Sequence, residues 1–76
     1  MGQLTTRIDT HHHTQDDAAA VWIVQHNLNI STPVVDCWLE IDGVITKVLP
    51  EEVYVENVNT INIIFPTAFA GRAIVA

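Results

Sequence analysis

Apolar and polar residues alternate along most of the chain after residue 20, with the two-residue period that is typical of β-strands. The alternation predicts strands over residues 20–26, 34–41, 44–48, 53–55, 60–65 and 72–76. Asp42 and Gly43 lie between two of these strands and favour a type I′ hairpin turn, which needs positive φ at both central residues. We therefore expect an all-β fold, as a small antiparallel β-sandwich or open barrel of five to six strands.

The same alternation divides each strand into a core face and an outer face. Residues 66–71 are expected to form a loop, with Phe69 packed back as an anchor. Cys37 lies between apolar neighbours, which indicates a buried, unreactive thiol rather than a nucleophile. The expected core residues lie two positions apart: Val35, Cys37, Leu39 and Ile41 in one strand, and Ile61, Ile63 and Phe65 in another.

The polar residues 1–19 are expected to form an N-terminal arm before a β-sandwich domain of residues 20–76. A short strand at residues 3–8 would need a partner to be stable. Within the arm, His11 and His13 lie on the same side of an extended chain. Three symmetry-related copies would present six imidazoles to one metal ion, whereas in a monomer the same histidines would belong to a solvated polar arm.

Composition narrows the classes of partner. The 76 residues form one domain, which at this size buries only roughly 60% of the surface of its unfolded chain. A hydrophobic content of 49% exceeds what such a small core can hide, which favours burial against other chains. The net charge of −6 argues against binding to nucleic acid or to an anionic membrane. The sequence has no apolar run long enough to span a membrane and no signal peptide, and its single cysteine fits a reducing cytoplasm.

Trp38 is the most informative surface candidate, because it shares the outer face of its strand with Asp36 and Glu40. Ile64 and Ile74 also fall opposite the core faces of their strands. If these apolar residues cluster, they form an apolar patch rimmed by acids, which is typical of a protein contact. The alternative is a core with two sides, closed by loops or by the arm.

Catalysis is not expected. The candidates are Asp36, Glu40, His26 and Cys37. Asp36 and Glu40 share a strand face, which can bring two carboxylates together, but exposed strand faces commonly carry acids for solubility. His26 directly precedes Asn27, and we expect its side chain to hold the following turn through a hydrogen bond to the backbone.

Several short motifs, in this order and spacing, resemble a small β-module of tailed-bacteriophage virion proteins, found in tail-fibre, baseplate and neck-appendage components. The resemblance covers residues 15–76 and implies a structural or attachment role without catalysis. Asn29 stands where family members commonly have Gly, and Asn tolerates the same positive φ. The motifs are Trp22-x-Val24-x-His26-Asn27-Leu28, Pro33-Val34-Val35, Asp42-Gly43, Pro50, Asn59-Thr60-x-Asn62-Ile63-x-Phe65 and Ala70-Gly71-x-Ala73-x-Val75.

The histidine pair also resembles the His-x-His elements that hold a metal on the threefold axis of trimeric phage fibres. The leading expectation is therefore a virion structural protein of the tail, baseplate or neck, folded in the host cytoplasm and assembled as a homotrimer with other virion proteins. No cofactor is expected; the alternative is a metal ion that His11 and His13 would hold on the symmetry axis. A capsid decoration protein is one alternative, and a glycan-binding module that uses Trp38 and Tyr54 as stacking platforms for host glycans is another.

Overall fold

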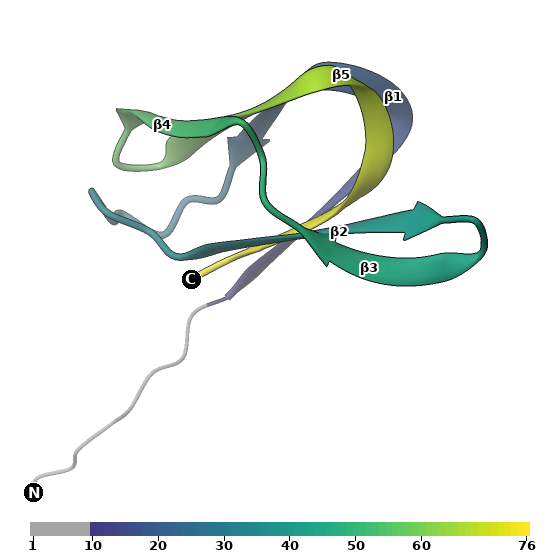
Figure 1. The fold of residues 1–76 in the computed structure, drawn as a ribbon. Helices are drawn as coiled ribbons and strands as arrows, with labels where there is room; N and C mark the ends of the chain where they lie inside the picture. Colours follow the sequence, from purple (N-terminus) through teal and green to yellow (C-terminus); the bar gives the residue numbers. More distant parts are fainter. Residues whose placement is uncertain (1–9) are drawn as a thin grey trace, which may run out of the picture.

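A computed structural model describes residues 10–76, which form one antiparallel sheet of five strands (Figure 1). The all-β class predicted from the alternation is confirmed. The central strand is β5, which pairs with three of the other four. The strands are β1 (His11–Gln25), β2 (Val35–Ile41), β3 (Val44–Val48), β4 (Glu52–Asn57) and β5 (Thr60–Val75).

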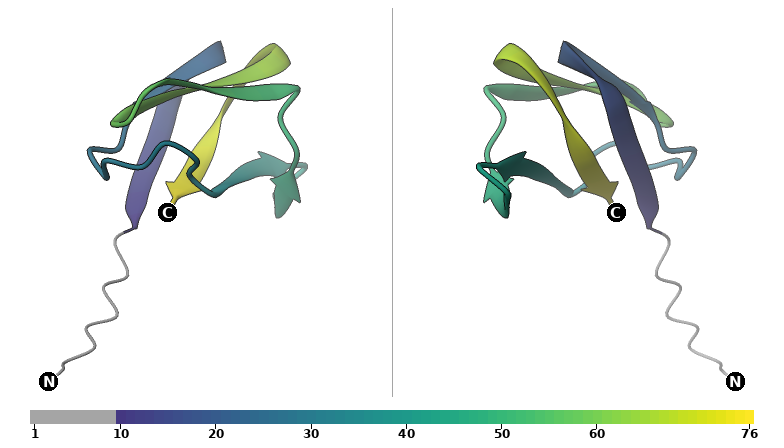
Figure 2. Two further views of the ribbon diagram at one scale, coloured as in Figure 1. Left: turned by 90° about the vertical axis from the view of Figure 1, so that its left-hand side faces the viewer. Right: turned by 90° about the vertical axis from the view of Figure 1, so that its right-hand side faces the viewer.

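The two long strands β1 and β5 pair with each other on both sides of a sharp bend (Figures 1 and 2). The register is irregular between Gln15 and Val21, and β5 makes no ladder pair with β1 from residue 65 to residue 68. Pro66 lies in this stretch, where its missing N–H breaks no ladder hydrogen bond. The bend divides the sheet into two parts, which we call the β4 half (β1, β5 and β4) and the β2 half (β1, β5, β2 and β3).

The core lies between the two halves of the bent sheet. Trp22 contributes most to it, with its ring centroid 4.7 Å from that of Phe65. The Trp22 Nε1–H also donates to the carbonyls of Ala19 and Phe69, both at 3.0 Å, and so joins the bends of β1 and β5. The buried apolar residues are Trp22, Val24, Ile61, Ile63 and Phe65 from the β4 half, and Cys37, Leu39, Ala73 and Val75 from the β2 half.

Gly71 is required where β5 packs closely against β2 and against the Trp22 ring. A Cβ atom at this position would lie 2.5 Å from the Trp38 carbonyl oxygen and 2.6 Å from Leu39 Cδ2. It would also lie 3.1 Å from the Trp22 ring. No residue with a side chain fits here without displacement of backbone, so glycine is needed for close packing rather than for an unusual φ angle.

The structure corrects the expected boundary of the N-terminal arm. His11 to Ala19 belong to β1, and the pairs His11 with Val75 and Gln15 with Gly71 hold them to β5. Their polar sequence gave no sign of a strand, because the pairing comes from residues about 60 positions later in the chain. The remaining arm and the short strand expected at residues 3–8 lie outside the described residues.

Two further expectations about strands are wrong. Residues 66–71 are part of β5 rather than a loop, so the strands expected at 60–65 and 72–76 are one bent strand. Ile41 is exposed rather than buried, because the β2–β3 hairpin extends past the core. The other core residues expected in these two strands are buried or, for Val35, packed against the core.

The turns follow the sequence closely. Asp42 and Gly43 have φ angles of 51° and 80° in a two-residue connection between Ile41 and Val44, as the hairpin prediction requires. Asn27 and Asn29 also have positive φ, at 57° and 55°. Asparagine adopts this left-handed conformation more readily than most residues, which explains its use at both positions.

Candidate functional site

The outer side of the β4 half carries a cluster of apolar side chains, which we call the apolar face. Val21 lies beside Ile64, and Ile23 lies across Asn62 from Tyr54. Ile23 is 66% exposed, and Val21 and Tyr54 are both 46% exposed. Adjacent strands place these residues as neighbours on one side of the sheet, with Asn62 between Ile23 and Tyr54 and Glu52 next to Ile64.

Asn62 lies at the centre of the apolar face and is only 2% exposed. Its Nδ2 donates to Glu56 Oε1 at 2.7 Å, but its Oδ1 has no hydrogen-bond partner among the described residues. An unpaired buried carbonyl costs about 1–3 kcal/mol. The apolar face therefore contains one buried acceptor that is left without a donor within residues 10–76.

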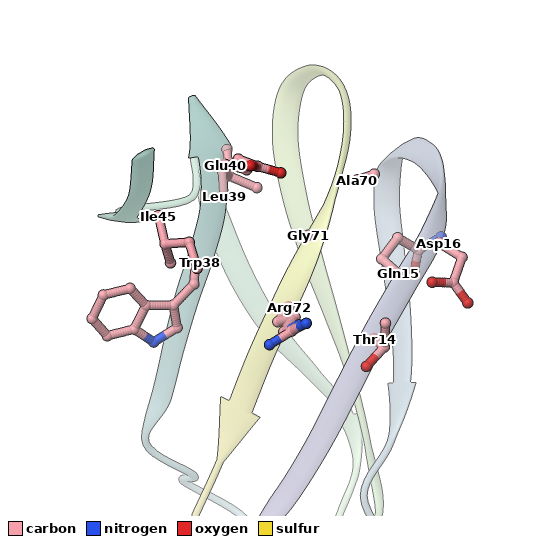
Figure 3. A pocket seen from close by; sticks show the side chains of 10 residues that line it. All are labelled: Thr14, Gln15, Asp16, Trp38, Leu39, Glu40, Ile45, Ala70, Gly71 and Arg72. Carbon is pink, nitrogen blue, oxygen red and sulfur yellow. The ribbon is translucent and has the colours of Figure 1, made fainter. Parts of the chain in front are cut away.

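The outer side of the β2 half differs in chemistry, and we call it the groove face. A row of three side chains crosses it, because Arg72 of β5 pairs with Trp38 of β2 on one side and with Thr14 of β1 on the other. Figure 3 shows Arg72 between these two neighbours, with the Trp38 indole extending away from Arg72 on the side where Ile45 lies. A hollow of about 270 Å³ opens beside this row.

The carboxylates of the groove face have different surroundings. Asp36 Oδ1 lies 3.1 Å from Lys47 Nζ in an ion pair, both of whose side chains are about half exposed. Glu40 lines the hollow together with Asp16 of β1. Asp36 and Glu40 share one face of β2 as the alternation predicts, but Asp36 is paired with a lysine rather than with Glu40.

The apolar patch expected around Trp38 is divided between the two faces. Trp38 and Ile74 lie on the groove face, whereas Ile64 and Tyr54 lie on the apolar face. The fold places these two faces on opposite sides of the core, so the expectation that they form one patch is wrong. The same separation means that Trp38 and Tyr54 do not form a shared stacking platform for a glycan.

The histidines expected to bind metal lie in β1. His11 and His13 are both half-buried, whereas His12 between them is exposed, so they share one side of the strand as predicted. This side is the inner one, which the sequence did not predict. His13 Nε2 lies 2.8 Å from Gln15 Oε1, and its ring centroid is 6.0 Å from that of Trp22. Within residues 10–76, no group of three or more potential ligands is placed to hold an ion in one chain. Metal binding between copies stays a prediction.

His26 holds the turn after β1 in the manner predicted. Its Nδ1 accepts a hydrogen bond from the Leu28 N–H at 3.0 Å, so the neutral ring carries its hydrogen on Nε2. This Nε2 has no partner in the described part of the chain, and the residue is 3% exposed. Burial, and then the charge of the nearby His11, lower the pKa of His26 below its ordinary value.

Cys37 is buried in the core, 1% exposed, as the alternation predicts. Burial, and to a smaller extent the neighbouring Asp36 carboxylate, raises the pKa of its thiol to about 11. A thiol with this pKa carries almost no thiolate at neutral pH, so Cys37 lacks the reactive form that a nucleophile or a metal ligand requires.

Two features of the faces had no signal in the sequence. Arg72, Thr14 and Asp16 come from segments that were expected to be a terminal strand and an arm, and only the pairing of β1 with β5 brings them beside Trp38. The burial of Asn62 was also missed, because its place in the alternation predicts an exposed residue. Neither result follows from local pattern, since both depend on neighbouring strands.

The comparisons with known proteins add no identification. No protein-family model, no curated protein and no solved structure matches the chain. Among residues 10–76, no helix is long and apolar enough to cross a membrane. The functional argument therefore rests on the two faces themselves.

Proposed function

We propose that this chain is a structural module of a tailed-bacteriophage virion, located in the tail, baseplate or neck and assembled as a symmetric homotrimer with other virion proteins. The observation that carries the proposal is the apolar face. Its neighbouring apolar side chains, Val21, Ile23, Tyr54 and Ile64, have the character of a protein contact. In this proposal the bent sheet works as a small β-sandwich whose outer side docks on neighbouring chains.

Free strand edges also support an assembly role. Within the described residues, β1 pairs only with β5, so the opposite edge of this 15-residue strand has no strand partner. The edge strands β3 and β4 likewise each pair with one neighbour. An unpaired edge presents backbone N–H and C=O groups to an added strand, and a protein that works in an assembly can cover such edges with neighbouring chains.

The first experiment is light scattering on the purified chain and on Ile23→Glu. We expect a trimer for the natural sequence and a monomer for Ile23→Glu, because the substitution places a charge in the apolar face. Ile45→Glu is the matched control, since Ile45 is 68% exposed but lies on the groove face. A stable monomer of the natural sequence, or equal effects of the two substitutions, would contradict the assembly proposal.

The place in the particle needs a second experiment. Gold-labelled antibodies against this chain should bind purified virions at the tail, baseplate or neck. Labelling spread over the capsid shell would instead identify a decoration protein, and absence of the chain from purified particles would reject a virion role.

The metal proposal is tested on the same oligomer. A chelator should lower the thermal midpoint of the trimer if His11 and His13 hold an ion on the axis, and the double substitution of both histidines by Gln should remove this sensitivity. An unchanged midpoint and unchanged oligomer would rule out the metal without affecting the assembly proposal.

A further inference from the structure

The groove face combines an aromatic ring, a cation and two carboxylates around one hollow. Arg72 lies in the middle of the row that crosses β2, β5 and β1 (Figure 3). Glu40 and Asp16 line the hollow from β2 and β1, on the two sides of β5. Since β5 is central, the three charged groups surround one region of the surface from three different strands.

The floor of the hollow is low because its residues are small. Ala70 precedes Gly71 on β5, and both line the hollow. Ala70 lies on the outer side of β5 with Arg72, and its small side chain leaves this part of the surface low. A Cβ atom at Gly71 would point into the core, so Gly71 contributes only backbone to the hollow. The hollow extends past Trp38 toward His12 and Ile74, where a second hollow continues it.

The polar groups around the hollow suit hydroxyl groups. A carboxylate only accepts hydrogen bonds, and a guanidinium only donates them, whereas a hydroxyl does both. Neighbouring hydroxyls on a ring can therefore donate to Glu40 or Asp16 and accept from Arg72 at the same time. The half-buried Trp38 adds a flat apolar surface against which the C–H groups of a sugar ring can pack. We propose that the groove face binds a neutral oligosaccharide.

Charge and geometry favour this ligand over other classes. An anionic sugar would meet two carboxylates and one guanidinium in a chain of net charge −6, while Lys47 is already paired with Asp36. An extended peptide gains affinity by hydrogen-bonding along a strand edge, but the groove lies on the face of the sheet, across the central strand. The groove uses Trp38 without Tyr54, and it is independent of the apolar face that carries the proposed assembly.

Tryptophan fluorescence gives a direct assay on the full chain. Trp22 is fully buried, so a change of emission on ligand addition reports on Trp38. The probes are four neutral tetrasaccharides, built of β-1,4-glucose, α-1,4-glucose, β-1,4-N-acetylglucosamine and β-1,4-galactose, with a tetramer of galacturonate as the anionic comparison. We expect at least one neutral probe to shift the emission saturably with a Kd below about 1 mM, and the galacturonate to bind more weakly.

Substitutions test whether the oligosaccharide binds at the groove face. Arg72→Ala should weaken binding of that probe by about ten-fold or more, and Arg72→Lys should give an intermediate loss, because lysine keeps the charge but not the planar fork. Tyr54→Ala is the matched control and should bind normally, since Tyr54 lies on the other face. Unchanged thermal midpoints for the Arg72 variants show that a loss of binding is not a loss of fold.

Three results would overturn the proposal. They are the absence of binding by all four neutral probes, stronger binding of the galacturonate, and binding that Tyr54→Ala removes but Arg72→Ala does not. None of them bears on the assembly proposal, which depends on the oligomeric state and on Ile23.

Discussion

The apolar face and the groove face are made largely from the same two strands, yet they differ in almost every chemical property. The second half of β1 and the first half of β5 contribute apolar side chains to one, and their other halves contribute polar and charged side chains to the other. The outer side of the β4 half is mainly apolar, and Asn62 at its centre has an unpaired buried acceptor and donates to the Glu56 carboxylate. The outer side of the β2 half has a cation between carboxylates.

The difference shows how a 76-residue chain can carry two separate surfaces. A flat sheet of this size would have one face for the core and one for solvent. Here the bend folds the sheet over its own core, so that the outer side faces in two directions. The residues of β1 and β5 before the bend and after it therefore lie on different outer surfaces. The sequence of each part can suit a different contact.

The largest expected effect comes from the position where the two halves meet. Gly71→Ala should remove both faces together, because the new Cβ would collide with the Trp38 carbonyl at 2.5 Å. We expect a loss of about 3 kcal/mol in the free energy of unfolding, or roughly 12 to 24 °C in the thermal midpoint. Ala68→Ser, at an exposed position in the same bend, is the control and should change the midpoint little. A midpoint for Gly71→Ala within a few degrees of the natural value would show that the halves are not packed as described.

A smaller loss is expected when the joint between the two bends is removed. Trp22→Phe keeps an aromatic ring in the core but deletes the N–H that donates to Ala19 and Phe69. Two carbonyls lose their donor and a cavity remains, so we expect a loss of about 2 kcal/mol, measured by urea unfolding. This loss of stability should weaken self-association at the apolar face and ligand binding at the groove face to a similar extent. A variant that affects only one face would contradict the view that Trp22 holds the shared bend.

Asn62→Leu should affect the apolar face and leave the groove face unchanged. It removes the unpaired Oδ1 from beneath the apolar face, and Glu56 is exposed, so its carboxylate can return to water. We expect the single chain to gain about 1 kcal/mol of stability in urea unfolding under conditions where it is monomeric, with no change at the groove face. If a neighbouring chain donates to Oδ1 in the trimer, the same substitution should weaken the trimer, measured by dilution in light scattering. Destabilisation of the single chain would show that Asn62 contributes more through Glu56 than its unpaired oxygen costs.

The smallest expected effect is the pH dependence of stability that comes from His26, which is buried and belongs to neither face. The pKa of His26 in the folded chain is below its ordinary value of 6.5, so the unfolded chain binds the proton more readily. The stability that neutral His26 contributes is therefore complete above pH 6.5 and decreases as the pH falls below that value. We expect a lower thermal midpoint at about pH 5.5 than at about pH 7.5.

His26→Gln should reduce this pH-dependent fall, and His12→Gln, at an exposed position of β1, serves as its control. If the thermal midpoint of His26→Gln fell with pH as much as that of the natural sequence, the pH dependence would come from other groups. The His26 variant should leave the difference between the two faces unchanged, because His26 is buried and belongs to neither face.

The sequence was informative wherever the physics is local. Asp42 and Gly43 specify their turn because only that backbone conformation connects two strands in two residues, and the structure has it. His26 bonds to the backbone two residues later, which is also a local contact. The alternation of Ile61, Ile63 and Phe65 identifies the core side of β5, because each strand must bury its apolar side.

Only the tertiary structure decided which polar segments are strands and which outer residues are neighbours. His11 to Gln15 have no local preference for a strand, and they form one because the end of β5 lies beside them. Trp38, Ile64 and Tyr54 have the same outward character in the sequence, but the bend sends them to opposite sides of the core. The local sequence pattern indicates whether a side chain faces the core. Pairing between distant strands decides which residues lie next to it, and in this chain that pairing determines the two candidate surfaces.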